Sequence, residues 1–286
     1  MTQILLTGKT GQVGWELQRT LATLGRVIAP DRRGMDLAEP ASIRAAIRAC
    51  MPQIIVNSAA YTAVDQAESE PDLALAINGA APAIMAEEAK RLGALLVHYS
   101  TDYVFDGAKS GPYSEDDTPN PLNVYGSSKL AGERAVVASG ARYLIFRTSW
   151  VYGARGKNFL RTILRLARER DELRIVDDQI GAPTWCRAIA EATAQALACA
   201  QACDAAGLSG IYHLSAAGAT SWCGFAKAIL ERPGHSCKVV PIASSEYPLP
   251  ARRPTNSVLS NAKLNARLGI ELPDWSAALE LCLQQD

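Results

Sequence analysis

A glycine-rich loop close to the N-terminus constrains the fold of this chain more than any other feature. The apolar run Ile4-Leu5-Leu6 is typical of a buried strand, the loop Gly8–Gly14 follows at once, and residues 15–22 have the pattern of an amphipathic helix. A dinucleotide pyrophosphate site needs this order, because glycines allow close backbone approach and a helix N-terminus favours negative charge. The spacing is G-x-x-G-x-x-G rather than G-x-G-x-x-G. In this position the loop predicts a bound nucleotide.

Strand-like and helix-like segments alternate after this loop. Buried-strand patterns lie at residues 27–29, 53–60, 94–102 and 143–152, and helical patterns at 40–50, 71–92 and around the Tyr125–Val136 segment. This alternation predicts an α/β fold with a Rossmann-type, doubly wound parallel sheet.

The regular alternation loosens after Gly153. A basic amphipathic helix at 158–169, a strand at 173–176, a helix at 186–203 and a last sheet strand at 211–214 are still predicted. We expect residues 1–152 and 184–216 to form a dinucleotide-binding domain. Residues 153–183 and 217–286 are expected to form a smaller C-terminal substrate-binding subdomain, interleaved with the first.

The end of the second predicted strand is where an adenosine ribose is recognised. An acidic residue there binds the 2′-hydroxyl of NADH, whereas an arginine accepts the 2′-phosphate of NADPH. This chain has both, since Asp31 is followed by Arg32 and Arg33, and Asp36-Leu37 follows where the adenine would lie. The pattern favours NADPH slightly and leaves NADH open.

A tyrosine and a lysine four residues apart, Tyr125 and Lys129, share one face of a predicted helix. A free tyrosine has a pKa of about 10. A nearby ammonium group favours the phenolate and lowers that pKa, so that the tyrosine can serve as a general acid or base on a carbonyl or alcohol. By itself this spacing also fits a packed tyrosine beside a solvated lysine.

The strand at 94–102 ends in Ser100-Thr101-Asp102, at the edge where open α/β sheets place their chemistry. His98 lies within the same strand, and we expect it to be a hydrogen-bonded core histidine and not a catalyst.

Composition excludes several other classes of protein. Lys plus Arg and Asp plus Glu are both 29, so the formal net charge is zero, which argues against a nucleic-acid or membrane-surface protein. No apolar stretch reaches the length of a membrane span, and the chain starts directly in a strand-like run. The cysteines are odd in number and scattered along the chain, which predicts that they are reduced core residues in a cytoplasmic protein. They are Cys50, Cys186, Cys199, Cys203, Cys223, Cys237 and Cys282.

The glycine loop, Ser100-Thr101-Asp102 and the Tyr125-x-x-x-Lys129 pair together resemble the extended short-chain dehydrogenase/reductase family. Within it, the chain is similar to reductases of 4-dehydro sugar nucleotides over essentially its whole length. The further matching stretches are Gly8–Leu17, Ser100–Phe105, Asn123–Glu133, Phe146–Tyr152, Asp178–Thr184, Pro250–Pro254 and Leu272–Trp275.

This resemblance implies NAD(P)H-dependent reduction of the C4 ketone of dTDP-4-dehydro-β-L-rhamnose to dTDP-β-L-rhamnose. That reaction is the last step of dTDP-rhamnose synthesis for cell-surface polysaccharide such as lipopolysaccharide O-antigen. It also implies that Tyr125 donates the proton, that Lys129 lowers the Tyr125 pKa and holds the nicotinamide ribose, and that Thr101 orients the carbonyl. The implied cofactor-lining residues are Gly8, Gly11, Gln12, Val13, Asp31, Arg32, Asp36, Leu37, Ala60, Tyr61, Thr62, Tyr125 and Lys129, and Thr101, Asp102 and Trp150 are implied to touch the sugar nucleotide.

Two further sites are expected. Arg252 and Arg253 are candidates for the substrate diphosphate, because a guanidinium fork suits phosphate oxygens, with a structural salt bridge as the alternative. The resemblance also implies a magnesium-bridged homodimer, with Glu16 and Glu191 as candidate ligands. Arg187 lies close to Glu191 in the sequence, and its positive charge disfavours a cation.

Two rival functions remain open. A sugar-nucleotide epimerase has the same fold, whereas a related dehydratase would carry an Asp-Glu pair directly after the threonine, where this chain has Asp102-Tyr103. The other rival is an NADP-binding, non-catalytic regulatory subunit, against which the intact Thr101, Tyr125 and Lys129 argue.

Overall fold

The computed structural model describes residues 1–202, 205–231 and 236–284. Its centre is a six-stranded, all-parallel sheet with the strand order β10-β5-β4-β3-β1-β2. The strands are β1 (Gln3–Thr7), β2 (Arg26–Ile28), β3 (Ile54–Asn57), β4 (Leu95–Thr101), β5 (Arg142–Thr148) and β10 (Gly210–His213). The predicted Rossmann-type doubly wound sheet is confirmed.

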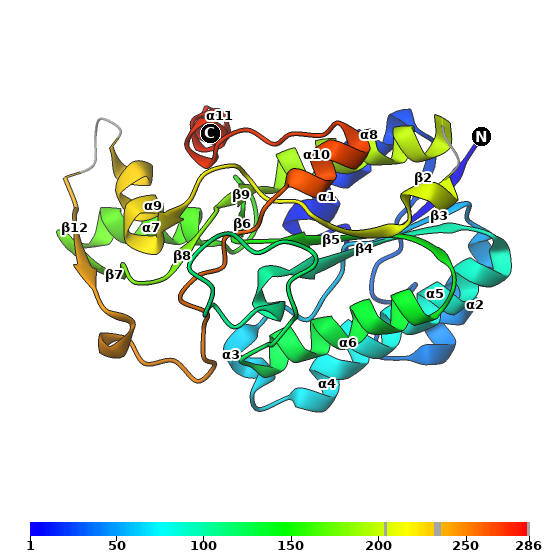
Figure 1. Cartoon of the computed structure of the whole chain (residues 1–286), viewed down its shortest axis with the longest axis horizontal. Helices are drawn as coiled ribbons and strands as arrows, with labels where there is room; N and C mark the ends of the chain where they lie inside the picture. Colours follow the sequence, from blue (N-terminus) through cyan, green and yellow to red (C-terminus); the bar gives the residue numbers. More distant parts are fainter. Residues whose placement is uncertain (203–204, 232–235, 285–286) are drawn as a thin grey trace.

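Helices cover both faces of this sheet (Figure 1). The helices α1 (Gln12–Thr20) and α8 (Cys186–Ala202) pack together on one face, and α2 (Pro40–Cys50), α5 (Ala81–Leu92) and α6 (Val124–Ala138) lie on the other. Alternate residues of β1 separate the two cores: Ile4 and Leu6 pack towards Leu17 of α1, while Leu5 packs with Ile43 of α2. The strands carry apolar side chains on both faces because both faces are covered.

The expected helix over residues 71–92 is not continuous. It begins as α4 (Pro71–Leu75), widens into a π-turn, η2 (Ala76–Ala80), and continues as α5. The wide turn lets Asn78 point inward, where it is 1% exposed and binds the Tyr61 backbone and Ser128. Such π-turns are frequent at functional sites. A short helix α3 (Val64–Ala67) and the 3-10 turns η1 (Leu21–Thr23), η3 (Asp102–Val104), η4 (Ala205–Leu208) and η5 (Ser244–Glu246) complete the connections.

A second, smaller set of elements lies beyond one end of the sheet (Figure 1). It contains α7 (Phe159–Glu169), α9 (Trp222–Leu230), and the parallel pair β7 (Glu172–Val176) and β12 (Lys238–Ile242). The pair β8 (Ile180–Gly181) with β11 (Thr220–Ser221) and the pair β6 (Val151–Tyr152) with β9 (Thr184–Trp185) join it to the main sheet. The helices α10 (Ala262–Leu268) and α11 (Trp275–Leu283) follow at the C-terminal side.

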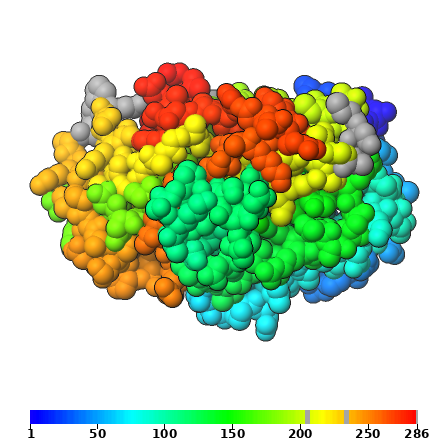
Figure 2. Space-filling view, in the orientation of Figure 1, coloured from blue at the N-terminus to red at the C-terminus, as the bar shows by residue number. Residues whose placement is uncertain are grey.

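The expected domain boundaries lie at the edges of one of these small sheets. Residues 151–152 pair with 184–185, and both strands belong to the expected dinucleotide-binding domain. The two parts are in contact through the loop before α6, since Tyr113 bridges to Leu259. Figure 2 shows this loop on the surface beside segments from the C-terminal part. The division into two interleaved units stays a prediction.

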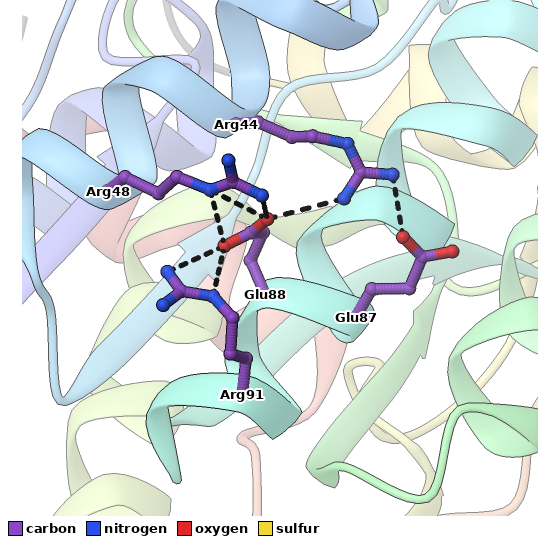
Figure 3. A network of polar contacts seen from close by, with 5 residues as sticks. All are labelled: Arg44, Arg48, Glu87, Glu88 and Arg91. Carbon is purple, nitrogen blue, oxygen red and sulfur yellow. Dashed lines mark hydrogen bonds and ion pairs between the residues drawn. The ribbon is translucent and has the colours of Figure 1, made fainter.

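A network of arginines and glutamates joins α2 to α5 (Figure 3). Glu88 is 2% exposed and accepts hydrogen bonds from Arg44, Arg48 and Arg91, with the shortest at 2.6 Å from Arg48. These guanidinium groups hold the pKa of Glu88 down at about 2, with Arg48 making the largest contribution. Arg44 also contacts Glu87 at 2.7 Å. The network fixes the two helices on this face of the sheet.

Three cysteines, Cys186, Cys223 and Cys282, lie buried in the core, as expected of core filler. Cys203 lies outside the described residues. His98 is fully buried and contacts Asn57 at 3.1 Å, so it is a core histidine. Among the described residues, no helix has the length and apolar character that a membrane crossing requires.

Candidate active site

A cleft of about 680 Å³ opens at the carboxyl ends of the sheet strands. Open α/β sheets bind ligands at this edge. The cleft brings together the glycine loop, the end of β4, the start of α6 and the exit of β5, which lie far apart in the sequence. The expected site residues that line it are Gly8, Gly11, Gln12, Val13, Ala60, Thr62, Thr101, Asp102, Tyr125, Lys129 and Trp150.

The glycine loop has glycines where no other residue fits. Gly8 has φ of +74°, and a Cβ there would lie 2.8 Å from the Ala59 nitrogen. A Cβ on Gly14 would lie 2.0 Å from the Gly8 carbonyl oxygen. The turn is closed by Gly11, whose amide donates to the Gly8 carbonyl at 2.9 Å. Such a turn brings the α1 N-terminus and bare backbone up to the cleft, which suits a pyrophosphate.

A second cavity of about 420 Å³ continues from the glycine loop towards the end of β2. Its lining includes Asp31, Arg32, Asp36 and Leu37, as expected for the adenosine end of a cofactor. The Asp31 carboxylate accepts hydrogen bonds from the Arg33 and Gly34 amides. Arg32 contacts Asp36 at 3.2 Å, and its side chain remains 79% exposed.

Tyr61 differs from the other expected cofactor residues. Its side chain is not among those that line the two cavities, and its hydroxyl donates to Glu70 at 2.7 Å. The Tyr61 backbone is held by Asn78, which accepts from its amide at 2.8 Å and donates to its carbonyl at 3.0 Å. Sequence reasoning missed Asn78, because only the π-turn turns this residue inward.

Helix α6 presents Tyr125 and Lys129 to the cleft. It begins at Val124, where the Asn123 side chain accepts from the Gly126 amide at 2.8 Å and caps the helix. A Cβ on Gly126 would lie 2.2 Å from the Tyr103 carbonyl, so glycine lets α6 lie directly against η3, the turn that follows β4. The predicted shared helix face of Tyr125 and Lys129 is confirmed.

Lys129 is 2% exposed and donates to the Tyr99 carbonyl at 2.5 Å. Burial lowers the pKa of Lys129 to about 8, and the negative charge of Glu133 opposes that shift. Glu133 lies one turn later on α6 and forms a buried bidentate pair with Arg147 of β5, with contacts of 2.9 Å and 2.7 Å. The buried pair therefore both anchors α6 and acts on the charge of Lys129.

The structure does not show the expected lowering of the Tyr125 pKa by Lys129. Burial raises the pKa of Tyr125 to about 12, the Thr101 hydroxyl partly opposes the rise, and the Asp102 charge adds to it. The Lys129 ammonium is turned to the Tyr99 carbonyl. Tyr125 is consequently a neutral phenol that holds its proton, the form that a general acid needs.

Thr101 and Asp102 form a hydrogen-bonded unit at the end of β4. The Thr101 hydroxyl donates to Asp102 Oδ1 at 2.9 Å and accepts from the Tyr103 amide at 3.1 Å. Asp102 is 2% exposed, and burial raises the pKa of its carboxyl to about 7. An acid that titrates near neutrality beside a phenol is a feature that the sequence did not predict.

Trp150 adopts an unusual backbone conformation, with φ of +46°. Its ring stacks on Trp222 with centroids 3.5 Å apart and planes at 4°. A Cβ on Gly181 would lie 2.4 Å from the Trp150 ring, so this glycine makes room for the indole. Trp222 also lines the cleft, and sequence reasoning missed it because it comes from α9, over 70 positions along the chain.

Arg252 and Arg253 are not among the residues that line the cleft. Arg253 forms a bidentate pair with Asp65 at 3.0 Å and 2.8 Å, which ties the C-terminal segment to α3. Arg252 is exposed, and its carbonyl accepts from Asn123 at 2.8 Å. For Arg253 this geometry favours the salt-bridge alternative.

The residues expected to bind magnesium do not form a cation site within the chain. Glu191 contacts Arg187 at 3.1 Å, so its charge is already balanced. In residues 1–202, 205–231 and 236–284 no cluster of three or more His, Cys, Asp or Glu is arranged to hold a metal ion. Within the described part of one chain, the two expected glutamates therefore supply too few oxygen ligands, because hard cations take six or more.

Similarity to known proteins identifies the family of this chain. The family model described as RmlD substrate binding domain matches residues 1–286. The dTDP-4-dehydrorhamnose reductase of Burkholderia thailandensis is 55% identical to the chain, with 99% of the chain and 98% of the relative covered. The chain belongs to the RmlD family. The Escherichia coli K12 enzyme of the same name is 46% identical, over 99% of the chain and 97% of the relative.

Solved structures agree with this membership of the RmlD family. The crystal structure of dTDP-4-dehydrorhamnose reductase from Bacillus anthracis in complex with NADP has a TM-score of 0.92 at 35% identity, covering 100% of this chain and 99% of that one. A Thermus thermophilus UDP-glucose 4-epimerase complex with NAD has a TM-score of 0.82 at 21% identity, covering 99% and 98%. The epimerase likeness shows the shared Rossmann-type fold alone.

Proposed function

We propose that this protein reduces the C4 ketone of dTDP-4-dehydro-β-L-rhamnose to dTDP-β-L-rhamnose with NADPH. The observation that carries the proposal is the convergence of Thr101, Tyr125 and Lys129 on one cleft that also contains the glycine loop. Relatives at 55% and 46% identity over nearly their whole length carry the name of this reductase.

Residues of the chain itself supply the proton that the reaction needs. When bound, the reduced nicotinamide supplies a hydride to the ketone carbon. Tyr125 holds its proton, because burial raises its pKa to about 12, and gives it to the developing alkoxide. Lys129, a buried ammonium that lines the cleft, is assigned to hold the nicotinamide ribose, as the family resemblance implies.

The cavity at the end of β2 supports NADPH over NADH. The Asp31 carboxylate accepts from two backbone amides at Oδ1, which leaves less of it for a ribose hydroxyl. Arg32 keeps an exposed guanidinium at the same cavity, and a guanidinium suits a 2′-phosphate. The glycine cradle at Gly8 and Gly14 leaves space for the pyrophosphate.

For the sugar nucleotide, Thr101, Asp102 and Trp150 are proposed to contact the substrate. Trp222 and Lys157 also line the cleft and extend this set. Arg252 stays a candidate for the diphosphate, because its side chain is exposed and no described residue forms an ion pair with it. A homodimer, bound Mg²⁺ and a cytoplasmic location stay predictions, which light scattering, metal analysis and cell fractionation test.

The direct test follows the loss of reduced-nicotinamide absorbance with enzymatically made dTDP-4-dehydrorhamnose, with NADPH and NADH in parallel. We expect faster turnover at low cofactor concentration with NADPH. Tyr125→Phe removes the proton donor with little change in shape, and its rate should fall by about 100-fold or more. Binding of NADPH to Tyr125→Phe, followed by fluorescence, controls for folding.

Other outcomes would favour the rivals. Interconversion of a sugar nucleotide without net cofactor oxidation would favour an epimerase. Tight NADPH binding with no turnover, together with a stoichiometric enzyme partner, would favour a regulatory subunit. Equal rates for Tyr125→Phe and the unmodified protein would refute the assigned proton donor.

A further inference from the structure

The connection between β6 and α7 lies against the start of α1, although the two segments are far apart in the sequence. We call this connection, residues 153–158, the strap. The Asn158 side-chain amide donates to the side-chain oxygen of Gln12 at 2.7 Å. The same amide donates to the carbonyls of Gly153 and Arg155, at 2.8 Å and 3.0 Å. One side chain therefore closes the strap on itself and fastens it to the first residue of α1.

Two further contacts hold the strap in place. The Arg155 guanidinium lies over the ring of Trp15 on α1, 4.3 Å from its centroid. Gly156 has φ of +77°, and a Cβ there would lie 3.2 Å from Gln12 Cγ, so the strap backbone lies close to the start of α1. Gly156 and Lys157 both line the cleft. The strap thus brings one lysine to the cleft, while its arginine is engaged by an indole.

Lys157 is a cation without a partner in this cleft. It is exposed, and no described residue forms an ion pair or a hydrogen bond with its ammonium. Among the described residues that line the cleft, the other cation is Lys129, whose buried ammonium donates to the Tyr99 carbonyl at 2.5 Å. Lys157 is therefore the cation of the cleft that is available to a negatively charged ligand.

The start of α1 also lacks a negative partner. Its N-cap is Gly11, which has no side-chain hydrogen bond to offer, and its first turn contains no acidic residue. The amides at the start of a helix have no partner within the helix and carry partial positive charge. These residues line the same cleft as Lys157. A diphosphate has oxygen atoms on two phosphorus atoms, so it can accept from the helix amides and from an ammonium at the same time.

We propose that Lys157 binds the diphosphate group of a nucleotide in the cleft, and that the Asn158–Gln12 hydrogen bond positions it there. The proposal rests on the reductase function given above, since the dinucleotide and the sugar nucleotide of that reaction each carry a diphosphate. The attachment of the strap to the first residue of α1 favours the diphosphate of the dinucleotide, because the glycine loop presents the α1 N-terminus to that group.

Equilibrium binding tests the role of the ammonium. Lys157→Met removes the charge and keeps an unbranched side chain of similar length. The Kd values of NADPH and NADH should rise by the same factor, about five- to 20-fold, because the two cofactors share the diphosphate. The Kd of adenosine 2′-monophosphate, which has no diphosphate, should stay unchanged. Lys90→Met, the same change at an exposed residue of α5, is the matched control and should leave all three Kd values unchanged.

A second variant tests the positioning role of Asn158. Asn158 also caps α7 by accepting from the Arg161 amide at 3.0 Å. In Asn158→Ser the serine can still cap the helix, but it is too short to bridge to Gln12. The Kd values of both cofactors should rise in this variant. In the Lys157→Met background the serine should add nothing, because Asn158 acts through the lysine. A full additional loss in the double variant would overturn the positioning role.

The binding of dTDP distinguishes the two sources of the diphosphate. If Lys157→Met raises the Kd of dTDP and leaves both cofactor Kd values unchanged, the diphosphate that Lys157 binds is that of the sugar nucleotide. If no Kd changes, or if the Kd of adenosine 2′-monophosphate rises as much as that of NADPH, the proposal is overturned. These measurements need no turnover. The absence of turnover by an unmodified protein that binds NADPH would therefore refute the reductase function alone.

Discussion

Removal of Glu133 from the buried Glu133–Arg147 pair should damage both the fold and the active site. Both side chains are 2% exposed, and two hydrogen bonds of 2.9 Å and 2.7 Å join α6 to β5. In the variant Glu133→Leu, the Arg147 guanidinium stays buried without its counter-charge. The loss of one partner of a buried pair costs about 3–5 kcal/mol, a large share of the roughly 5–15 kcal/mol that holds a domain folded.

The same substitution should change the charge of Lys129. Glu133 is the group that raises the Lys129 pKa against burial, which sets it at about 8. Without Glu133 that pKa moves lower, so Lys129 loses its charge at a lower pH. The limb of the kcat profile that reports the loss of the Lys129 proton should therefore shift to lower pH.

Two assays separate these effects. Urea unfolding of Glu133→Leu should show a clearly lower midpoint than that of the unmodified protein. The double variant Glu133→Leu with Arg147→Met replaces the pair by apolar side chains, and such replacements are often neutral or stabilising, so much of the stability should return. The shift in the kcat profile should persist in the double variant. A double variant as unstable as Glu133→Leu would refute the reasoning from the unpaired charge.

Two further predictions concern charged residues away from the reacting atoms. Arg32→Ala should raise KM for NADPH about five- to tenfold and leave KM for NADH unchanged. The reason is that an exposed guanidinium contributes on the order of 1 kcal/mol to phosphate binding. Equal effects on the two KM values would exclude a contact between Arg32 and the 2′-phosphate. Glu88 has a pKa of about 2, below its ordinary 4.5, so its contribution to stability is present above pH 4.5 and is lost as pH falls towards 2. Glu88→Gln should therefore lower the free energy of unfolding near pH 7 by about 1–3 kcal/mol, and that free energy should fall less than in the unmodified protein as the pH is lowered. Urea unfolding measures both effects. A variant that is destabilised by acid as much as the unmodified protein would contradict the role of the ionised Glu88 carboxylate.

The local sequence determined the elements of the fold. Apolar runs such as Ile4-Leu5-Leu6 form strands because both faces of the parallel sheet are covered, and Gly8 and Gly14 are required by backbone approach within a few residues. The shared face of Tyr125 and Lys129 follows from helix geometry. Features of this kind depend on neighbours in the chain, so they can be predicted from sequence.

Tertiary structure decided the protonation states and the hydrogen-bond partners of the active-site side chains. The neutral state of Tyr125, the near-neutral pKa of Asp102 and the contact of Lys129 with the Tyr99 carbonyl arise from burial and from partners on other elements. The pairing of Arg253 with Asp65 joins positions 188 residues apart. Desolvation and long-range contacts form only when the chain is packed, which is why the sequence by itself placed the reacting residues but not their protonation states.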